Sequence, residues 1–426
     1  MTAQADFIGG RWIELDTEGL SVIQSVNPAK PPEVVWRGAP RMEHVSQAVA
    51  AARRALPAWS ASTRDERIAV LQKFAEQCTK AAPAMAALIT REVGKTLAES
   101  ALEAKLLADK VAITTDPQSL GRVSDYDVAA GASRTGHCRF KPLGVMAVVG
   151  PFNFPAHLPN GHIVPALLLG NTVVFKPSEK APAVGQELAR LFAECVPPGV
   201  FNLVQGTGEH AAALTGHDDV DGILFTGSWP VGRRILQANL DRPGRMVALE
   251  MGGNNASVVL DDADLRLAVV ECARAAFATT GQRCTCTRRI VVQRGIADRF
   301  LRALVQVAKS ITVGAGDSDP PVFMGPLVTR QARDAVLAFQ QDVAARGGRV
   351  LVAAEARDPG WLLTPGVVQV DRFTRTHDTE VFGPLVQVAI ADTLDDAIAQ
   401  ANATEYGLAA AIFTRSRESF ERFFAQ

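Results

Sequence analysis

Four short apolar runs restrict the fold more than any other feature of this sequence. Each is bounded by glycine or polar residues, and a stretch of helical periodicity separates it from the next; the runs are 145–150, 172–176, 201–205 and 222–226. Short continuous apolar runs are typical of strands buried on both faces. Because strands that alternate with helices form parallel sheets, the sequence predicts a doubly wound α/β sheet, with a fifth strand at 247–250.

The same alternation resumes after residue 251 and predicts a second α/β domain. Its strands are expected at 256–260, 290–292, 367–370, 385–391 and 408–413, with helices at 268–280, 300–310, 331–346 and 394–402. Asp264 is placed to cap the helix that leads to the cysteine-containing segment 281–286, because aspartate accepts hydrogen bonds from the first N–H groups of a helix.

The N-terminal region has a different pattern. A hairpin is predicted at 7–12, a loop at 25–30 and helices at about 45–56, 63–78, 81–92 and 96–113. Pro57 is expected to end the first helix, since proline removes a helical hydrogen bond, and Thr63 with Glu66 forms a capping box at the start of the second. Residues 114–139 are polar and turn-rich, which predicts an arm or an exposed hairpin.

Composition narrows the classes of partner. The chain has 44 basic and 45 acidic residues and a net charge of -1, which argues against nucleic acid and anionic membrane surfaces. No apolar run approaches the ~20 residues of a membrane span, and residues 1–6 lack the features of a signal peptide. The cysteines are too scattered for a disulfide scaffold, and the histidines form no metal-binding pattern. We therefore expect a cytoplasmic protein with reduced thiols and no metal.

Ligands of a parallel sheet bind outside the carboxyl ends of its strands, so the loops after the predicted strands are candidate sites. Asn153 follows the first strand in a loop whose prolines restrict the backbone. Lys176 and Glu179 follow the second strand, where a lysine can bind ribose or phosphate and a carboxylate can hold a ribose diol. A solvated surface loop is the alternative for this pair.

The loop after the fourth strand is a candidate pyrophosphate site. Gly227 and Ser228 open a helix that contains Gly232, and the N–H groups and dipole of a helix N-terminus favour anions. The pattern is neither Gly-x-Gly-x-x-Gly nor a P-loop, so an ordinary turn is the alternative. Glu250 ends the fifth strand and begins a further glycine-containing loop, 250–255.

Cys284 lies on a link between an alanine-rich helical run and a strand, where a side chain can reach a cleft. Its neighbour Arg283 is a cation that would favour the nucleophilic thiolate. However, neighbours on an extended loop point to opposite sides, so Arg283 is also a candidate for contact with substrate or a partner. A small apolar core residue is the alternative for Cys284, and Cys286 is expected to be a neighbour rather than a second nucleophile.

Several segments occur in one order along the chain. They are Asn-Phe-Pro at 153–155, Lys-Pro-Ser-Glu at 176–179, Phe-Thr-Gly-Ser at 225–228, Leu-Glu-Met-Gly-Gly-Asn-Asn at 249–255, Gly-Gln-Arg-Cys at 281–284, Glu-Val-Phe-Gly-Pro at 380–384 and Asn-x-x-x-Tyr-Gly-Leu at 402–408. In order and spacing they resemble the NAD(P)-dependent aldehyde dehydrogenase superfamily over nearly the whole chain. Within it, segments 154–165, 250–255 and 281–286 resemble the bacterial N-succinylglutamate 5-semialdehyde dehydrogenases, which act in arginine catabolism.

The resemblance implies a reaction as well as a fold. The fold would be α/β, with two doubly wound parallel-sheet domains and a small oligomerisation arm. The reaction would be NAD-dependent oxidation of N-succinyl-L-glutamate 5-semialdehyde to N-succinyl-L-glutamate. Cys284 would attack this small-molecule aldehyde to give a thiohemiacetal and then a thioester. Asn153 and the Cys284 backbone N–H would hold the oxyanion, and Glu250 would activate the water that hydrolyses the thioester.

The resemblance also implies which residues bind the cofactor NAD. They are Lys176 and Glu179 at the adenine ribose with Ser178 between them, Gly227, Ser228 and Gly232 at the pyrophosphate, and Glu380 and Phe382 at the nicotinamide ribose. The carboxylate of Glu179 favours NAD over NADP, because it would repel a 2′-phosphate. Among the remaining polar residues, His157, Asn160, His162 and Arg283 are expected to contact a charged substrate tail.

By the same resemblance, residues 1–113 and 140–250 form the NAD-binding domain, 114–139 the oligomerisation arm and 251–426 the catalytic domain. Family members continue past the position of Gln426 into a Pro-Phe-Gly-Gly segment and a strand that pairs across subunits. The full-length protein is therefore expected to be a homodimer or a dimer of dimers. Two other functions stay open: a dehydrogenase for another acidic or general aldehyde, and a catalytically silent nucleotide-binding fragment.

Overall fold

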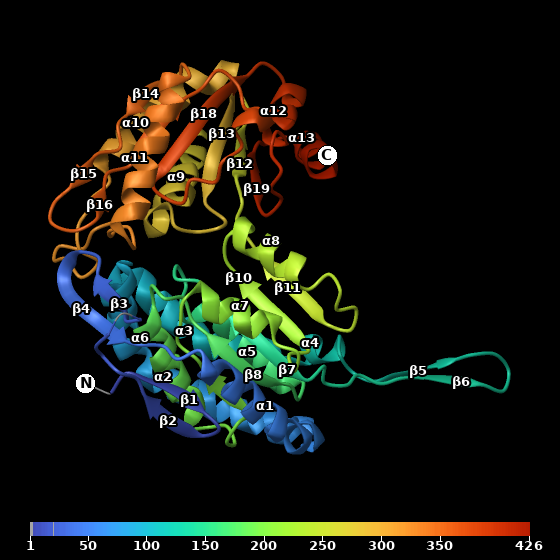
Figure 1. Cartoon of the computed structure of the whole chain (residues 1–426). Coiled ribbons are helices and arrows are strands. Elements are labelled where there is room, and N and C mark those ends of the chain that lie inside the picture. Colours follow the sequence, from blue (N-terminus) through green and yellow to red (C-terminus); the bar gives the residue numbers. More distant parts are fainter. Residues whose placement is uncertain (1–2, 20) are drawn as a thin grey trace. The chain divides into compact units, whose positions relative to one another are not determined.

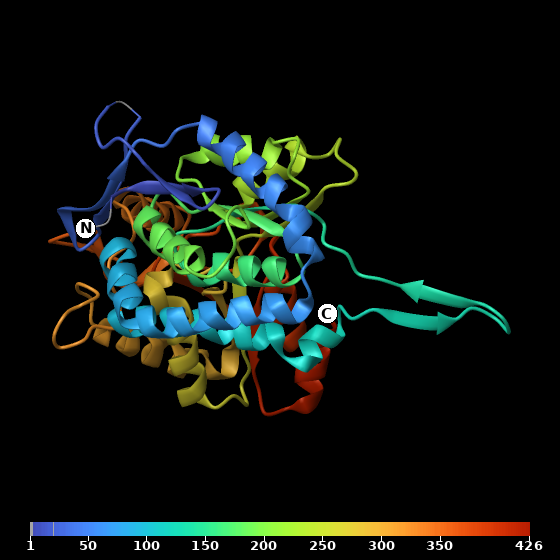
Figure 2. The same cartoon turned by 90° about the horizontal axis from the view of Figure 1, so that it is seen from below.

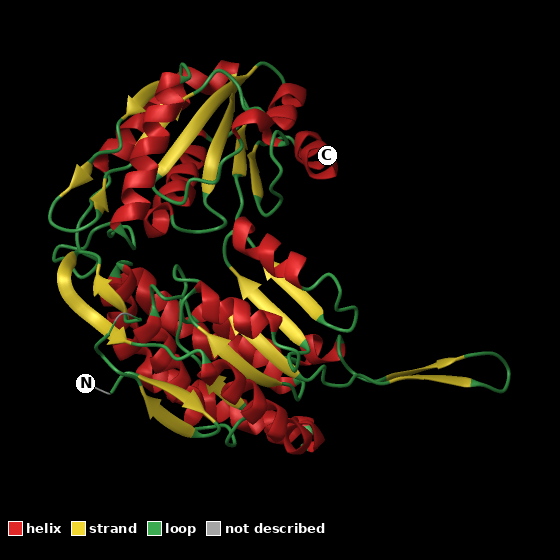
Figure 3. Cartoon of the chain, viewed as in Figure 1, coloured by secondary structure: helices red, strands yellow, loops and turns green. Residues whose placement is uncertain are grey.

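The chain divides into two α/β units in the computed structural model, which describes residues 3–19 and 21–426. The first unit comprises the residues up to Val26 together with Glu33–Glu92 and Ala98–Met251, and the second comprises Asn27–Pro32, Val93–Leu97 and Gly252–Gln426. Helices and strands alternate through most of both units, as Figure 3 shows. Within the described residues, no helix is long and apolar enough to cross a membrane.

The sheet of the first unit has a parallel body and an antiparallel edge. Its order is β11 (Met246–Glu250), β10 (Gly222–Thr226), β7 (Val145–Val149), β8 (Thr172–Lys176), β9 (Phe201–Leu203), β1 (Ala5–Ile8) and β2 (Arg11–Glu14). The predicted hairpin at the N-terminus is confirmed as β1 and β2, which form the antiparallel edge. The chain winds outward from β7 through β8 to β9 and then returns to β10 on the other side of β7. This reversal makes the carboxyl ends of β7 and β10 a switch point, where ligands of open α/β sheets bind.

Helices cover both faces of this sheet (Figure 1). On one face, α1 (Glu43–Ala61), α7 (Gly208–Gly216) and α8 (Trp229–Ala238) pack on alternate strand residues such as Val145 and Val149. On the other, Phe192 of α6 (Pro182–Ala193) stacks on Phe201 with ring centroids 4.8 Å apart. The helix α5 (His157–Leu168) packs against β7, β8 and β10. Burial on both faces explains why these strands are continuously apolar in sequence.

Two expected helix breaks are wrong. The helix α1 continues through Pro57 to Ala61, and the predicted helices 63–78 and 81–92 are one helix, α2 (Arg64–Val93), which passes through Pro83. In α1 the turn after Pro57 buries Trp59, whose indole N–H donates to the carbonyl of Leu167 at 3.2 Å. Tertiary packing of this kind offsets the helical hydrogen bond that a proline removes.

The capping box is confirmed, whereas the expected loop at 25–30 is wrong. Thr63 N–H donates to the Glu66 carboxylate at 2.7 Å, and Glu66 N–H donates to the Thr63 hydroxyl at 3.2 Å. Residues 25–27 and Lys30 instead belong to a two-stranded sheet of β3 (Ile23–Asn27) and β4 (Lys30–Gly38), and only Pro28 and Ala29 form the turn between the strands. The Asn27 side chain accepts from Ala29 N–H at 3.0 Å, a local turn that brings the two strands together.

The polar region predicted as an arm or hairpin follows α3 (Leu97–Thr115) and begins with the short helix α4 (Pro117–Gly121). It then forms an antiparallel hairpin of β5 (Tyr126–Ala129) and β6 (Thr135–Cys138). In both Figure 1 and Figure 2 this hairpin is a long two-stranded ribbon without a helix against it. Tyr126 and Val128 on it are 53% and 52% exposed, an unusual degree of exposure for large apolar side chains on a strand.

The second unit has its own mixed sheet. Its order is β14 (Arg349–Val352), β17 (Gly366–Gln369), β18 (Leu385–Ala391), β13 (Thr287–Gln293), β12 (Asn255–Val259) and β19 (Ala410–Phe413), with the first pair antiparallel and the others parallel. The helices α9 (Leu265–Phe277) and α10 (Arg294–Ser310) cover one face, and α12 (Leu394–Ala401) and α13 (Arg417–Ala425) pack on the alternate residues of the other. The helix α11 (Arg330–Ala345) lies against β14 and β17, and a further pair, β15 (Ala356–Arg357) and β16 (Leu362–Leu363), lies outside this sheet. The predicted cap of Asp264 on α9 is confirmed, because its carboxylate accepts from Leu267 N–H at 3.0 Å.

Gly144, which directly precedes β7, tests the packing at the centre of the first sheet. Its φ is +138°, and an added Cβ would lie 1.9 Å from the Asp221 carboxylate that accepts from Val145 N–H. We expect Gly144→Ala to lower the free energy of unfolding by at least about 1–3 kcal/mol. At Gly216, in α7, nothing lies within 4 Å of an added Cβ. Gly216→Ala should therefore raise the free energy of unfolding, by less than about 1 kcal/mol. Urea denaturation measures both, and equal effects would contradict this account.

Candidate active site

The structure brings the predicted residues of the first unit to one edge of its sheet. Lys176 is the last residue of β8 and Glu250 the last residue of β11, and the loops after β7 and β10 contain Asn153 and Ser228. Because these strands are parallel, their carboxyl ends meet at the same edge. Gly227 N–H donates to the carbonyl of Glu250 at 3.0 Å, which joins two of these loops directly.

The loop that contains Asn153 is held by a buried carboxylate from a distant helix. Glu103 of α3 is fully buried, and one of its oxygens accepts from Ala156 N–H at 3.0 Å and from His157 N–H at 3.1 Å. These N–H groups stand at the start of α5, where helical donors have no partner within the helix. The carboxylate therefore fixes the end of the loop in which Asn153, 6% exposed, lies. Sequence reasoning missed Glu103, because nothing local links it to a loop about fifty residues away.

The predicted ribose pair is in contact. The Lys176 ammonium lies 3.6 Å from the Glu179 carboxylate, with Lys176 buried and Glu179 exposed. Burial lowers the pKa of Lys176, and the charge of Glu179 opposes that shift. Between them, the Ser178 hydroxyl accepts from Lys180 N–H at 3.3 Å, which tightens the turn. The arrangement offers an ammonium donor and a carboxylate acceptor at one strand end.

The start of α8 presents helix N–H groups at the neighbouring strand end. Ser228 occupies the N-cap with extended backbone angles, and Trp229 begins the helix. Gly232 in the first turn is buried, and a Cβ there would lie 2.5 Å from the Met251 sulfur. Gly232 thus allows close packing of α8 against the segment after β11, a role glycine also has in dinucleotide-binding turns.

In the second unit, the turn before Cys284 has a strained backbone. Thr279 and Thr280 have φ of 53° and 55°, which is uncommon for residues other than glycine, and Gly281 has φ of 68°. The Thr280 hydroxyl donates to the carbonyl of Gly325 at 2.9 Å. An added Cβ at Gly281 would lie 2.1 Å from the carbonyl oxygen of Gly383. Only glycine fits there, both because of its φ and because the 383 segment lies directly on the turn.

Cys284 is half-buried, and its surroundings disfavour the thiolate. Burial raises the pKa of the Cys284 thiol, and the negative charge of Glu380 adds to the increase, although backbone N–H groups act against it. The adjacent Arg283 does not bring this pKa below that of a free thiol. The Arg283 side chain instead donates to the Thr279 hydroxyl at 2.7 Å. Cys286 is buried, with its thiol 3.9 Å from the carbonyl of Ala278.

The loop that contains Cys284 is tied to β12 by one amide side chain. The Asn255 NH₂ group donates to the carbonyls of Cys284 at 2.7 Å and Cys286 at 2.9 Å, and its oxygen accepts from Ala409 N–H at 3.0 Å. Asn255 is 5% exposed, so these contacts satisfy its buried polar atoms. Sequence reasoning quoted Asn255 only as part of a motif, and its own role depends on segments far apart in the chain.

Glu380 lies against the glycine loop that follows β11. Its carboxylate accepts from Gly253 N–H at 3.1 Å, and a Cβ at Gly252 would lie 1.9 Å from it. Burial raises the pKa of Glu380, while the guanidinium of Arg288, 3.6 Å away, opposes that shift. The structure thus brings together, within the second unit, Glu380 and the segments 252–255 and 281–286.

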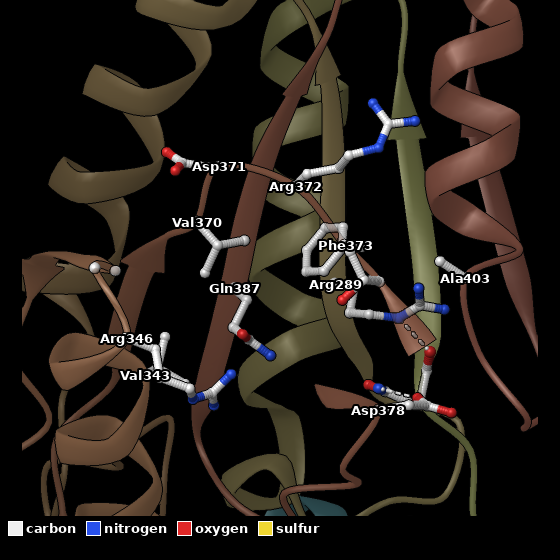
Figure 4. A pocket seen from close by; sticks show the side chains of 14 residues that line it. Arg289, Val343, Arg346, Val370, Asp371, Arg372, Phe373, Asp378, Gln387 and Ala403 are labelled. Atoms are coloured by element: carbon white, nitrogen blue, oxygen red, sulfur yellow. Dashed lines mark hydrogen bonds between the residues drawn. The ribbon is translucent and has the colours of Figure 1, made fainter. Parts of the chain in front are cut away.

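Two residues before Glu380, Asp378 lines a cavity of about 140 Å³ (Figure 4). Its carboxylate accepts from the Asn254 NH₂ group at 2.7 Å, the Thr404 hydroxyl at 2.8 Å and Glu405 N–H at 2.6 Å. The half-buried Asp378 carboxylate, two residues before Glu380, therefore joins the motif stretches 249–255 and 402–408.

Comparison with known proteins agrees with this arrangement. The family model described as the aldehyde dehydrogenase family matches residues 12–426. The N-succinylglutamate 5-semialdehyde dehydrogenase of Chromobacterium violaceum is 41% identical over 424 residues, which cover 99% of this chain and 86% of that protein. The chain belongs to the aldehyde dehydrogenase family. Its members oxidise aldehydes, so the predicted family and enzyme class are confirmed.

Further relatives support the same placement. The N-succinylglutamate 5-semialdehyde dehydrogenase of Escherichia coli (strain K12) is 41% identical over 426 residues, covering 98% of this chain and 84% of that one. The crystal structure of PnpE in complex with nicotinamide adenine dinucleotide is 34% identical and superposes with a TM-score of 0.93, covering 99% of this chain and 87% of that chain. The predicted α/β aldehyde dehydrogenase fold is therefore confirmed, with the addition that both sheets have antiparallel edge strands.

The charge of Glu380 makes a prediction about thiol reactivity. Glu380→Gln removes a negative charge that disfavours the thiolate, so the pKa of Cys284 should fall and its alkylation by iodoacetamide at pH 8 should become about threefold faster. Burial remains, so the pKa should stay above that of free cysteine. Alkylation is followed by peptide mapping, because Cys138 and Cys195 are also partly exposed. The control is Glu405→Gln, which removes an exposed carboxylate paired with Arg375. An unchanged or slower rate of Cys284 alkylation in Glu380→Gln would contradict the electrostatic account.

Proposed function

We propose that this aldehyde dehydrogenase oxidises N-succinyl-L-glutamate 5-semialdehyde to N-succinyl-L-glutamate with NAD, as a step of arginine catabolism. The observation that carries the substrate is the 41% identity, along almost the whole chain, to enzymes named N-succinylglutamate 5-semialdehyde dehydrogenase. The chemistry is supported by the side chains at the two groups of loops, which supply a nucleophile, an amide donor and a carboxylate base.

Cys284 is the proposed nucleophile. Its thiolate adds to the aldehyde carbon, and the resulting oxyanion is stabilised by the Asn153 amide and the Cys284 backbone N–H. NAD, when bound, accepts the hydride, and a thioester to Cys284 remains. Since burial and Glu380 raise the pKa of Cys284, a smaller fraction of this thiol is ionised at neutral pH than of a free cysteine.

Glu250 is the proposed general base of the second half-reaction. It is an exposed carboxylate at the end of β11, with its backbone fixed by the bond from Gly227 N–H. In the proposed step it removes a proton from water, which attacks the thioester carbon; the C–S bond breaks and the Cys284 thiol is released with the acid product. A positioned carboxylate base typically contributes a factor of about 10²–10⁴ to the rate of such a step.

The residues of the first unit fit NAD. An ammonium has three N–H donors, and the contact of Lys176 with Glu179 uses one of them while the Glu179 carboxylate remains exposed to accept from a ribose diol. Ser228 and Gly227 stand at the N-terminus of α8, where N–H groups and the dipole favour pyrophosphate. In the second unit, Glu380 and Phe382 are proposed to hold the nicotinamide ribose. The carboxylate of Glu179 favours NAD, because it would repel the 2′-phosphate of NADP.

Two residues expected at the substrate tail are engaged inside the first unit. Asn160 is fully buried, and its NH₂ group donates to the carbonyl of Leu107 at 3.1 Å, so its assignment to the tail is wrong. His162 lies 3.0 Å from the Thr226 hydroxyl, and burial lowers its pKa to about 4, so it is neutral at pH 7 and does not pair with a carboxylate. We therefore propose that other residues recognise the succinyl group, and half-buried Arg283 is the candidate cation.

The exposed hairpin is proposed as the oligomerisation arm, within residues 114–139. Tyr126 and Val128 expose large apolar surface on a two-stranded ribbon, and an isolated hairpin of this kind is marginally stable in water. A partner subunit that covers it would remove this surface from water. The remaining assignments are an NAD-binding domain of residues 1–113 and 140–250, a catalytic domain of residues 251–426, a homodimer or dimer of dimers, and a cytoplasmic location.

The mechanism makes separate predictions for Cys284 and Glu250. Cys284→Ala should abolish aldehyde-dependent NADH formation. Glu250→Gln should keep a burst of NADH equal to the enzyme concentration, because hydride transfer precedes hydrolysis, while steady-state turnover falls by about 10²–10⁴. Stopped-flow absorbance at 340 nm measures both phases. Turnover by Cys284→Ala, or loss of the burst in Glu250→Gln, would contradict the assigned roles.

Substrate selectivity distinguishes the proposal from its alternatives. Among N-succinylglutamate semialdehyde, glutamate semialdehyde and succinate semialdehyde, we expect kcat/KM to be highest for the first by at least about tenfold, because a site built for two carboxylates loses charge-assisted contacts with the others. A higher kcat/KM for another aldehyde would favour the general dehydrogenase. No NADH with any of them, together with Cys284 alkylation that does not respond to NAD, would favour the silent fragment.

A further inference from the structure

Arg288 is a buried cation whose donors all point at the loops of the second unit. It is the second residue of β13 and is 3% exposed. Its guanidinium donates to four backbone carbonyls: Gly253 at 3.3 Å, Gly281 at 3.1 Å, Val381 at 2.6 Å and Arg283 at 2.8 Å. These carbonyls belong to three segments that are distant in sequence, so one side chain holds them in a fixed relation.

Arg288 lies at a register shift between β12 and β13. Asn255 pairs with Thr287 and Ala256 with Arg289 in the ladder of β12 and β13, so Arg288 is the extra residue between two successive pairs. Irregularities of this kind re-aim side chains and are over-represented next to active sites. Arg288 and Arg289, which are adjacent in sequence, bond to different segments: Arg288 to the carbonyls of Arg283 and Val381, and Arg289 to those of Gln400 and Ala401.

The bond to the Arg283 carbonyl bears directly on the oxyanion donor. That carbonyl and the Cys284 N–H are the two polar ends of the same peptide group. A charged donor 2.8 Å from the carbonyl oxygen fixes the plane of the peptide, and hydrogen bonds in a chain polarise one another, which strengthens the N–H as a donor. Arg288 can therefore influence the oxyanion without contact with the substrate.

The same guanidinium contacts both residues assigned to the nicotinamide ribose. It lies 3.6 Å from the Glu380 carboxylate and 5.2 Å from the centroid of the Phe382 ring. Its bond to the Val381 carbonyl holds the backbone between them. The cofactor segment and the nucleophile loop are thus fixed by one rigid, planar group.

We propose that Arg288 is a positioning residue that couples the cofactor carboxylate Glu380 to the orientation of the Cys284 peptide N–H. The proposal rests on the roles given to Cys284 and Glu380 under the proposed function. A change at Glu380 is transmitted through Arg288 to the Cys284 N–H, which is the oxyanion donor. Loss of Arg288 removes the bonds that hold both Glu380 and this peptide group in place. Arginine suits the position because its planar fork presents donors in several fixed directions, whereas the ammonium of lysine is a compact point charge.

Arg289 is a matched control. It is equally buried, at 3% exposed, and also donates to backbone carbonyls: Asn254 at 2.8 Å, Gln400 at 3.0 Å and Ala401 at 2.9 Å. It lies over the Phe373 ring and lines the cavity shown in Figure 4, beside Asp378. Arg288 bonds to four backbone carbonyls and Arg289 to three, so replacement by lysine removes a similar set of bonds in each case. Only Arg288 bonds to the loop that contains Cys284.

The test compares Arg288→Lys with Arg289→Lys in the folded enzyme. Both should lower Tm. Arg288→Lys should lower kcat by about 10²-fold, the lower end for loss of one oxyanion donor, and should also change the KM for NAD. Arg289→Lys should keep kcat within about threefold, a small change on the scale of transition-state stabilisation. Equal losses of kcat in the two variants would overturn the proposal, since they would reflect general destabilisation. If Arg288→Lys does not fold, Arg288→Gln is measured in the same way.

A double-mutant cycle tests the coupling itself. Arg288→Lys and Glu380→Gln are combined and kcat is compared with the product of the single effects. Coupled residues should give a double variant at least about fivefold more active than that product; effects that multiply would overturn the proposal. A wild type that forms no NADH would contradict the proposed function, whereas effects on kcat that multiply in an enzyme that does form NADH would contradict the coupling.

Discussion

The second unit depends on a turn whose backbone is unfavourable by itself. Thr279, Thr280 and Gly281 are in left-handed conformations one after another, and such strain persists only where surrounding contacts over-determine it. Those contacts come from Gly325 and from the segment at Gly383, which fits only because Gly281 has no side chain. The strained turn presents Cys284 on a loop and at the same time brings the Glu380 segment against it. The backbone strain at residues 279–281 and the contact between the Cys284 loop and the Glu380 segment therefore both arise from this turn.

Loops that leave regular secondary structure need partners for their backbone groups, and this protein supplies them with buried or half-buried polar side chains. In the second unit, Asn255 and Arg288 bind the carbonyls around Cys284, and Asp378 joins the segments beside Glu380. In the first unit, Glu103 holds the N–H groups after Asn153 in the same way. Each of these side chains is satisfied by several bonds, which makes burial of a polar or charged group tolerable. The result is a set of loops that are rigid without being helix or strand.

The places where sequence reasoning failed share one physical cause. Pro57 was expected to end a helix from a local rule, but α1 continues because packing of the following turn, which buries Trp59, outweighs one lost hydrogen bond. The helices expected at 63–78 and 81–92 are the single helix α2. The adjacent Arg283 was one candidate influence on the thiol pKa, but burial and the charge of Glu380, almost a hundred residues away, raise it. Asn160 was expected at the substrate and is instead buried against Leu107. In each case a local pattern competes with a contact that the sequence does not display.

The sequence by itself determined the alternation of strands and helices, the strand ends at which ligands bind, and the family, because hydrophobic periodicity and ordered motifs are local and survive without any knowledge of packing. It also singled out Asn153, Glu250, Cys284 and the cofactor loops as candidates. Only the tertiary structure revealed Glu103, Arg288, Asp378 and the part that Asn255 has in holding the loop around Cys284, and only it decided the direction of the cysteine pKa shift. Hydrogen bonds and desolvation depend on which distant atoms share a volume, and that is a property of the folded chain.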